Sequence, residues 1–477
     1  MIVTYLGHQG WAFDTSVGTV FLDPIFKTIG NAGVQLPVWP DREIDTKSLP
    51  RIGGLIISHE HSDHFDIDTL LRMPWRGTVY ISDRSSQAIF ELLVDLGYTP
   101  VRLGAYDEIQ FGDVNFRLLP LAWSLLEPDA YGYLVRSDDD TSFFTSVDGM
   151  PHQETIQWLK KHCPLRTVDN FTNNYLEPLP ELTTGDGADK QAVGMMVSNL
   201  ISSVNLLAPR RVVMSGQGWS YPPKYSELNH RFFSVTHQAL LPIMQDIYPD
   251  IRWQAPEPGT YIGLAGEECD GSTASYVIAR SPTNRDYHDY TRALSGEPWS
   301  RNRSLGKRAL DKVLDFIQIE FARKIDTYGH RLIRRLYELS LNPTTDLMPT
   351  IALRILNGDD AYHFIMDQGW LRFVSATDDL DIRSDVAAGI EIWASDLELL
   401  INGNEEPYLV YETAVRRWCN VSSLISSSVH VHIFLAFGPR NQPEEYLEGY
   451  RARLRKLRQT ESSAKELRCR VENITSP

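Results

Sequence analysis

The sequence has few cysteines and no long hydrophobic run. The 477 residues include four cysteines, far apart and without a C-x-x-C pair: Cys163, Cys269, Cys419 and Cys469. This excludes a disulfide framework and any two-cysteine cluster motif. No stretch approaches the roughly 20 apolar residues of a membrane span. The start, Met1 to His8, reads directly into a strand and lacks the layout of a signal peptide. We therefore expect a cytoplasmic protein that does not cross a membrane.

Positive charge is also scarce. The 46 Lys and Arg residues face 62 Asp and Glu residues, and the net charge is −16. Such an acidic balance argues against nucleic acid or an anionic membrane as a partner. The remaining composition is ordinary, with 42% hydrophobic and 23% charged residues, which excludes disorder as a general description. A chain of this length predicts two or three domains.

Short apolar runs with helical patterns between them indicate an α/β region up to about residue 260. Helices are expected at Ser85–Leu96 and Gln153–Lys161. This order of elements predicts two sheets packed face to face with helices outside. The expected strands are Ile2–Leu6, Thr19–Leu22, Gly54–Ser58, Thr78–Ile81, Val114–Leu119, Gly132–Val135, Ser142–Thr145 and Arg211–Met214.

The pattern changes after a polar, loop-rich stretch. Apolar residues at helical spacing predict one long or broken helix over Leu310–Leu341. Asn357–Asp360 is a strong turn signal between two strands. We therefore predict a first domain at 1–262, loops at 263–308 and a C-terminal α+β domain at 309–477. The expected strands are Ile351–Leu356, Ala361–Met366, Trp370–Val374 and Gly389–Trp393, and the last of them feeds a capped helix at Ser395–Leu400.

A final helix is expected after Pro443, and its far end is basic. A solvated helix face is the plainer interpretation of this charge, and membrane binding is the alternative. The basic residues are Arg451, Arg453, Arg455, Lys456 and Arg458.

The densest group of chemically active residues follows an apolar strand. The chain reads IISHEHSDHFD over residues 56–66, and only 13 histidines occur in the whole sequence, so a chance cluster is a poor explanation. Two histidines two residues apart lie on one face of an extended backbone. The next two polar residues can turn towards a second point, so two hard cations fit side by side. The four candidate ligands are His59, His61, Asp63 and His64.

An H-x-H-x-D-H pattern after an apolar strand resembles the signature of the metallo-β-lactamase superfamily. Leu6–Trp11 and Phe21–Pro24 are also similar to the opening strands of that superfamily. The resemblance covers roughly residues 1–260. It implies an αββα sandwich with a dinuclear metal site at the strand ends. It also implies that Asp148, after the strand that includes Phe143 and Phe144, bridges both metals.

The sequence departs from the hydrolytic members of that superfamily at two ligand positions. Trp123 stands where a His is expected, and the nearest side chain able to bind a metal is Glu127. The last His, expected after the strand at 211–214, is absent. His230 is the nearest replacement and His237 is its rival. The alternative interpretations are a surface carboxylate for Glu127 and a structural histidine for His230.

The implied site contains histidines and carboxylates but no thiolate. A Glu in place of a neutral His adds a hard, negatively charged donor, which favours iron over zinc. The pattern therefore resembles the oxygen-activating diiron enzymes built on this fold, with Glu127 and Asp148 as residues of the reaction. The implied ligands are His59, His61 and Glu127 for site one, Asp63, His64 and His230 for site two, and Asp148 as the bridge.

A second resemblance concerns the whole layout. A metal domain followed by the segments 389–400 and 415–420 is similar to the CMP-N-acetylneuraminate hydroxylase family and its relatives, which include the diiron hydroxylase of platensimycin and platencin biosynthesis. The sequence holds no C-x-H…C-x-x-H pattern, which excludes an internal Rieske cluster and disfavours a nucleotide-sugar substrate. The C-terminal strands also resemble sterol-carrier-like folds. This region is therefore either a structural cap or a shelf for a hydrophobic or thioester-tethered substrate.

These features together predict a nonheme diiron monooxygenase that hydroxylates a C–H bond of a natural-product intermediate. The candidate substrates are a terpenoid and a CoA- or carrier-tethered acid. The reaction needs O2 and electrons from an external ferredoxin or reductase. The alternative is a dinuclear zinc hydrolase of a thioester, lactone or phosphoester. A degenerate protein that only binds a ligand is disfavoured by the intact motif residues.

Overall fold

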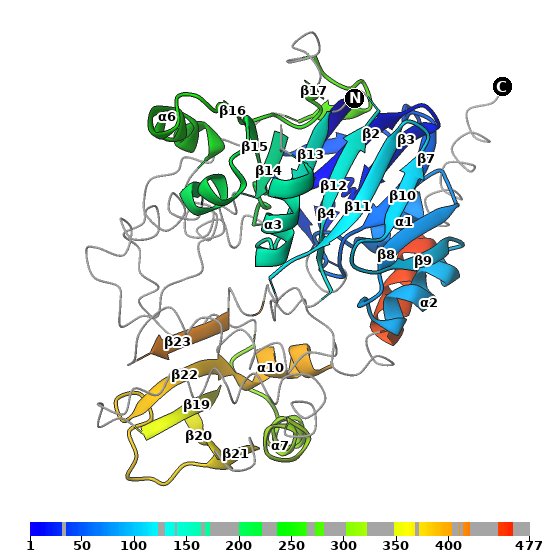
Figure 1. The fold of residues 1–477 in the computed structure, drawn as a ribbon. Helices are drawn as coiled ribbons and strands as arrows, with labels where there is room; N and C mark the ends of the chain where they lie inside the picture. Colours follow the sequence, from blue (N-terminus) through cyan, green and yellow to red (C-terminus); the bar gives the residue numbers. More distant parts are fainter. Residues whose placement is uncertain are drawn as a thin grey trace, which may run out of the picture.

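Two seven-stranded sheets face each other in the first half of the chain, and a separate five-stranded sheet belongs to the second half (Figure 1). Glu127 and His230, two of the predicted ligands, lie outside the described residues. The computed structural model describes residues 1–30, 35–122, 129–138, 141–163, 167–171, 200–221, 236–264, 272–280, 302–321, 348–367, 372–402, 410, 414–419 and 447–460.

The first sheet has the strand order β17-β1-β2-β3-β7-β8-β9. Its first four strands pair antiparallel, and β3, β7, β8 and β9 pair in parallel. The turn between β2 and β3 requires glycine, because Gly18 has a φ of +125° and a Cβ there would lie 2.7 Å from the Arg51 carbonyl oxygen. The strands are β1 (Ile2–Gly7), β2 (Gly10–Thr15), β3 (Gly18–Leu22), β7 (Ile52–Ile57), β8 (Thr78–Ser82), β9 (Thr99–Leu103) and β17 (Tyr261–Gly263).

The second sheet repeats this plan, with the order β10-β11-β12-β13-β14-β15-β16. Strands β10 to β13 pair antiparallel, and β13 to β16 pair in parallel. The carboxyl ends of β13, β14 and β15 therefore meet at one edge of the sheet. The strands are β10 (Glu108–Phe111), β11 (Val114–Pro120), β12 (Tyr131–Ser137), β13 (Ser142–Thr145), β14 (Thr167–Phe171), β15 (Arg211–Ser215) and β16 (Arg252–Gln254).

Aromatic side chains fill the space between the two sheets. Trp11 and Phe143 have ring centroids 5.0 Å apart, and Phe13 and Phe116 have centroids 5.2 Å apart. Helices cover the outer faces, so the predicted αββα sandwich is confirmed. The helices are α1 (Ile67–Arg72) and α2 (Gln87–Asp95) on the first sheet, and α3 (Gln153–His162), the helical residues 200–207 and α6 (His237–Ile247) on the second.

All eight strands predicted for this region are confirmed, with ends shifted by a few residues. The strands that were not predicted have weaker patterns. Strand β2 contains a glycine and an exposed aspartate, and β14 reads TVDNF, with two polar residues in five. Eight further strands among the described residues also lie outside the prediction: β9, β10, β16, β17, β4 (Thr28–Ile29), β5 (Leu36–Pro37), β6 (Arg42–Ile44) and β18 (Val277–Ala279).

The C-terminal sheet has the order β21-β20-β19-β22-β23, and helical segments pack on one face of it. The predicted hairpin is confirmed, with Gly358 at a φ of +63° in its turn. The predicted helix over Leu310–Leu341 is found up to Phe321, and its remainder lies outside the described residues. The elements are α7 (Lys307–Asp315), a π-helix η3 (Phe316–Glu320), β19 (Met348–Asn357), β20 (Asp360–Asp367), β21 (Arg372–Ser375), β22 (Val386–Trp393), α10 (Ala394–Ile401) and β23 (Val415–Cys419).

The capped start predicted for the helix at Ser395–Leu400 is wrong. Helix α10 begins directly after β22, with Trp393 at the capping position and no side-chain hydrogen bond to the first turn. The Ser395 hydroxyl donates instead to the carbonyl oxygen of Asn302. A long-range contact therefore uses the hydroxyl that the local pattern assigned to capping.

A last helix, residues 447–460, packs on the first sheet's helices. It lies beside α2 in Figure 1, where it is drawn in red. The Tyr450 ring lies 5.6 Å from that of Phe65, and Arg451 pairs with Asp95 at 2.8 Å. One face of this helix is thus buried, while Arg455 on another face is largely exposed. Within the described part of the chain, none of the helices combines the length and the apolarity that a membrane crossing requires.

Candidate metal centre

Polar side chains gather at one edge of the sandwich, where several strands end. Strand β3 ends just before Asp23, and its parallel neighbour β7 ends just before Ser58 and His59. The backbone N–H of Asp23 donates to the carbonyl oxygen of Ile56 at 3.0 Å, which holds these two ends together. Asp148 follows the end of β13 on the facing sheet. The edge of the sandwich thus brings residues from distant parts of the sequence into one place.

His59 and His61 lie on one face, as the spacing predicted. Their ring centroids are 4.6 Å apart, and both side chains are buried. The Nδ1 atom of His59 lies 2.9 Å from the Ser58 hydroxyl, which itself donates to Asp23 at 2.5 Å. This chain of contacts fixes the His59 ring and leaves its Nε2 atom facing the centre.

The next part of the motif folds into a turn that leads into α1. The backbone N–H of His64 donates to the His61 carbonyl at 3.0 Å, and Asp66 caps α1 by accepting from the Thr69 N–H at 2.7 Å. His64 is completely buried, and its Nδ1 lies 2.8 Å from Asp23. One buried carboxylate, Asp23, therefore orients both imidazoles of the centre.

Asp148 lies between the two histidines. Its Oδ2 atom is 3.5 Å from Nε2 of His59 and 3.1 Å from Nε2 of His64. The donor atoms of these three residues all lie within 4.8 Å of one another. This is the position that a carboxylate shared by two metals requires, and the bridging role itself stays a prediction.

A second cluster of donor atoms joins His8, Asp63 and His64. His8 Nε2 lies 3.0 Å from Oδ2 of Asp63, and His64 Nε2 lies 3.7 Å from the same oxygen. The neighbouring Gln9 donates to Asp148. The sequence pattern assigns Leu6–Trp11 to the opening strands and does not identify His8 or Gln9 as residues of the site. A polar pair at the end of a strand, on the edge that also carries the motif, was the signal that could have identified them.

The charges of this centre are strongly coupled. Burial by itself lowers the pKa of His64, but the carboxylates of Asp148, Asp63 and Asp23 outweigh it and raise this pKa well above its usual range. Burial by itself raises the pKa values of Asp63 and Asp148, but the neighbouring histidines lower both well below the usual range. The two carboxylates of Asp63 and Asp148 thus remain ionised in a buried site.

The donor set fits a pair of metal ions. Two donors about 2.1 Å from one ion are about 3.0 Å apart at a right angle and about 3.4 Å apart in a tetrahedron, close to the spacings observed here. His59 Nε2 is buried and has no hydrogen-bond partner among the residues that the structure describes. In the described part of the chain, Asp63 and Asp148 have no ion pair with Lys or Arg. Apart from histidine, the described side chains supply no cation to these buried carboxylates.

The other predicted ligands are placed as follows. Glu127 and His230 lie outside the described residues. His237 is fully buried as the first residue of α6 and belongs to neither donor cluster. His61 also belongs to neither cluster, although its ring contacts His59. Asp129 is buried, and its Oδ2 accepts from the backbone N–H of Glu60 at 3.1 Å.

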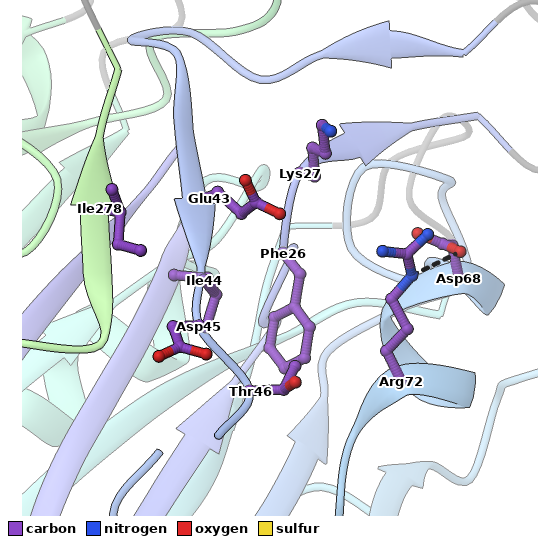
Figure 2. Close-up of a pocket in the computed structure, with 9 residues that line it drawn as sticks. All are labelled: Phe26, Lys27, Glu43, Ile44, Asp45, Thr46, Asp68, Arg72 and Ile278. Atoms are coloured by element: carbon purple, nitrogen blue, oxygen red, sulfur yellow. Dashed lines mark hydrogen bonds and ion pairs between the residues drawn. The ribbon is translucent and has the colours of Figure 1, made fainter. Parts of the chain in front are cut away.

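A pocket of about 280 Å³ lies between α1 and the paired strands β6 and β18 (Figure 2). Its wall carries charges of both signs, and several of these are paired: Asp68 with Arg72 at 2.9 Å, and Glu43 with Arg280. None of its lining residues belongs to either donor cluster. The pocket is therefore separate from the candidate metal centre.

Comparisons with known proteins agree with this geometry. Residues 19–214 match the family model described as a beta-lactamase superfamily domain. The chain contains a metallo-β-lactamase superfamily domain. Its histidine and aspartate clusters are consistent with a dinuclear metal site, and the domain is that of a metal-dependent enzyme. Among curated proteins, none matches the sequence.

Several solved structures are distantly similar to part of this chain. CmlA, a diiron beta-hydroxylase from Streptomyces venezuelae, is 16% identical, with a TM-score of 0.37 over 55% of this chain and 53% of that chain. A mutant of the CmlA beta-hydroxylase is 18% identical, with a TM-score of 0.39 over 55% of this chain and 54% of that chain. The isothiocyanate hydrolase from Delia radicum gut bacteria is 16% identical, with a TM-score of 0.40 over 55% of this chain and 99% of that chain. The match spans about half the length of CmlA. These likenesses concern the fold alone, and the neighbours include both a hydroxylase and a hydrolase.

Proposed function

We propose that this chain is a nonheme diiron monooxygenase that hydroxylates a C–H bond of a small-molecule biosynthetic intermediate. The observation that carries the proposal is the contact of Asp129 with the metal motif. The Asp129 carboxylate accepts from the backbone N–H of Glu60, between His59 and His61, and from the Ser85 hydroxyl at 3.4 Å. This contact holds the start of β12 beside the two histidines.

The sequence leaves few candidates for a third ligand beside His59 and His61. No histidine lies between His64 and His152, and His152 caps α3 by accepting from the Glu154 N–H. The Asp129 carboxylate already accepts a hydrogen bond from the backbone N–H of Glu60 in the motif. Glu127 is two residues earlier, and two residues span at most about 7 Å. These facts support Glu127 as the remaining ligand.

A carboxylate-rich shell without thiolate favours iron. Iron, when bound by these residues, supplies the activation of O2, which is cofactor chemistry. The chain's own contribution is to orient the donors through Asp23 and Ser58 and to keep water away from the buried histidines. The overall reaction consumes R–H, O2, two electrons and two protons, and it yields R–OH and water.

The electrons in this proposal come from a separate ferredoxin or reductase, since the sequence holds no Rieske pattern. The substrate is a terpenoid or a CoA- or carrier-tethered acid. The C-terminal sheet serves either as its shelf or as a cap. The acidic overall charge of −16 gives no reason to invoke nucleic acid or an anionic membrane as a partner.

The deciding experiment follows the oxygen atom. Iron-loaded protein is incubated with a reductase system, 18O2 and a panel of terpenoid and thioester-bound acids, and product is analysed by mass spectrometry. One 18O atom per hydroxylated product is expected from O2, and none from water. Label from water only, in anaerobic samples that hold two zinc ions, would instead identify the hydrolase alternative and overturn the proposal.

Glu127 supplies the second part of this test. Glu127→Ala is expected to lose iron and oxygenase activity. Glu154→Ala is the matched control, because this carboxylate lies exposed in the first turn of α3, away from the donor clusters. Unchanged iron content in Glu127→Ala would show that another residue completes the site.

A further inference from the structure

The turn between β1 and β2 touches both carboxylates of the candidate metal centre. His8 Nε2 lies 3.0 Å from Asp63, and the Gln9 amide nitrogen donates to Asp148. Asp63 belongs to the motif after β7, whereas Asp148 follows β13 on the other sheet. Two adjacent residues of one turn therefore reach one carboxylate on each side of the centre.

The turn itself is firmly held. The His8 carbonyl oxygen accepts from the Tyr5 hydroxyl at 2.9 Å and from the Gly216 N–H at 2.7 Å. The fully buried Arg42 donates to the carbonyl oxygen of Leu6, directly before the turn, and a Cβ at Gly7 would collide with the same guanidinium group. His8 also keeps a left-handed backbone, with a φ of +52°. Because this backbone is held in place, the Cα and Cβ atoms of His8 and Gln9 have defined positions relative to the two carboxylates.

The contacts of His8 are the reverse of those made by the other two histidines. His59 and His64 use Nδ1 to contact Ser58 and Asp23, and their Nε2 atoms face Asp148. His8 uses Nε2 to contact a carboxylate, while its buried Nδ1 has no hydrogen-bond partner among the described residues. A histidine that binds a metal normally has its other nitrogen held by a neighbour. His8 lacks that support.

Hydrogen-bond chemistry then fixes the direction of both contacts. An ionised carboxylate only accepts, so the nitrogen atoms of His8 and Gln9 that face Asp63 and Asp148 must donate. In a neutral His8 this corresponds to the Nε2–H tautomer, in which Nδ1 carries an acceptor lone pair. For Asp148, Gln9 occupies Oδ1, and Oδ2 is the atom that faces His59 and His64.

We propose that His8 and Gln9 are positioning residues, which hold Asp63 and Asp148 so that the donor atoms of both carboxylates converge on the two metals. This inference rests on the dinuclear site of the proposed function, but not on iron or on oxygen chemistry. It predicts different effects for the two residues. Loss of the His8 donor loosens Asp63 alone, whereas loss of the Gln9 donor loosens the carboxylate that lies between both sites.

The test measures metal affinity, so that it is independent of turnover. Apo-protein is titrated with Co2+ and with Zn2+ against a chromophoric chelator, and folding is checked by circular dichroism. His8→Phe is expected to weaken one of two binding steps 10- to 100-fold, the usual loss for a partner of a metal ligand. Gln9→Leu is expected to weaken both steps. His8→Gln, which keeps a donor near the Nε2 position, is expected to restore most of the affinity.

The matched control is Tyr5→Phe. It removes a hydrogen bond to the backbone of the same turn without touching either carboxylate. Wild-type affinity in both His8→Phe and Gln9→Leu overturns the inference, and so does a Tyr5→Phe defect as large as theirs, because the turn then acts through its backbone. If His8→Phe does not fold, the metal affinities of His8→Gln and Gln9→Leu are compared instead, and the inference requires that only Gln9→Leu is strongly weakened. Two metals bound tightly, without O2-dependent product, would refute the proposed function alone.

Discussion

Three non-glycine residues with left-handed backbone lie at the edge of the sandwich that carries the metal centre. They are His8, Asp23 and Val147, with φ values of 52°, 46° and 49°. Each such residue costs on the order of 1–3 kcal/mol and persists only where the surroundings enforce it. His8 and Asp23 contact the motif directly, and Val147 precedes Asp148. The fold therefore tolerates an unfavourable backbone conformation at positions that orient the residues of the metal centre.

Asp23 has the largest number of contacts to the motif, and its replacement is the sharpest test at the residue scale. It accepts from the Ser58 N–H at 2.7 Å and from the Ser58 hydroxyl, and it contacts His64 Nδ1. Asp23→Asn introduces a donor where three donors converge, so we expect a 10- to 100-fold loss of metal affinity. Competition against a chelator measures it. Asp14→Asn, an exposed aspartate in the same sheet, should change nothing, and equal losses in both variants would contradict this role.

At the scale of elements, one polar row crosses the C-terminal sheet. His363, Arg354, Glu391 and Arg416 are register partners on four adjacent strands. Glu391 is 0% exposed and pairs with Arg354, with Arg416 at 3.0 Å and with Arg383 at 2.7 Å. Burial by itself raises the pKa of Glu391, but these arginines outweigh it and hold the pKa below its usual value of 4.5. The Glu391 carboxylate thus ties β19, β22 and β23 together, and His363 of β20 joins the row through Arg354.

The pH dependence of this row has a definite sign. Because the pKa of Glu391 is lower in the folded than in the unfolded chain, its contribution is complete above pH 4.5 and is lost as the pH falls towards the folded value. Glu391→Gln should cost about 2 kcal/mol at pH 7, since it leaves the arginines without their shared partner. The difference from wild type should shrink in urea unfolding at pH 4 and below. A difference that is independent of pH would contradict the ionised network.

The helix at residues 447–460 connects the end of the described chain to the metal motif. Tyr450 contacts Phe65, and Phe65 directly follows His64. Tyr450→Ala should therefore cost about 3 kcal/mol of unfolding free energy, typical of a buried aromatic residue. It should also weaken metal binding several-fold, because the turn that carries His64 loses its support. Arg455→Ala is the exposed control on the same helix. Unchanged metal affinity in Tyr450→Ala would show that the helix only covers the surface.

At the scale of the whole molecule, the buried carboxylates link folding to metal binding. Asp23, Asp63 and Asp148 lie close together, and their described ion-pair partners are histidines, without a lysine or an arginine. A metal that binds only the folded chain stabilises it by about 2.7 kcal/mol at a hundredfold excess over Kd. Chelation should therefore lower the Tm by several degrees, and adding back Fe2+ should restore it. A Tm that does not respond to chelation would contradict metal binding at this centre.

Much of the fold was predictable from the sequence, because it depends on local patterns. Apolar runs predicted eight strands of the sandwich, and the turn at Asn357–Asp360 predicted a hairpin, all of which are present. The pattern failed where tertiary contacts override it. Ser395 looked like a helix cap, but a carbonyl oxygen more than ninety residues away in the sequence takes its hydroxyl. Strand β14 is held by two parallel neighbours despite its polar sequence.

The residues of the candidate site also fall into two groups, those that local sequence patterns predict and those that only the tertiary structure identifies. His59, His61, Asp63 and His64 are adjacent in the chain, so their spacing alone indicated metal chemistry. Asp148 entered only through the resemblance to a family, since no local pattern joins it to the motif. His8, Gln9 and Asp23 become partners of that motif only when the two sheets face each other and the ends of β1, β3, β7 and β13 meet at one edge. A hydrogen bond depends on distance in space, and separation along the chain does not record it. The sequence by itself therefore determined which residues can bind metal, while the tertiary structure decided which residues hold them in place.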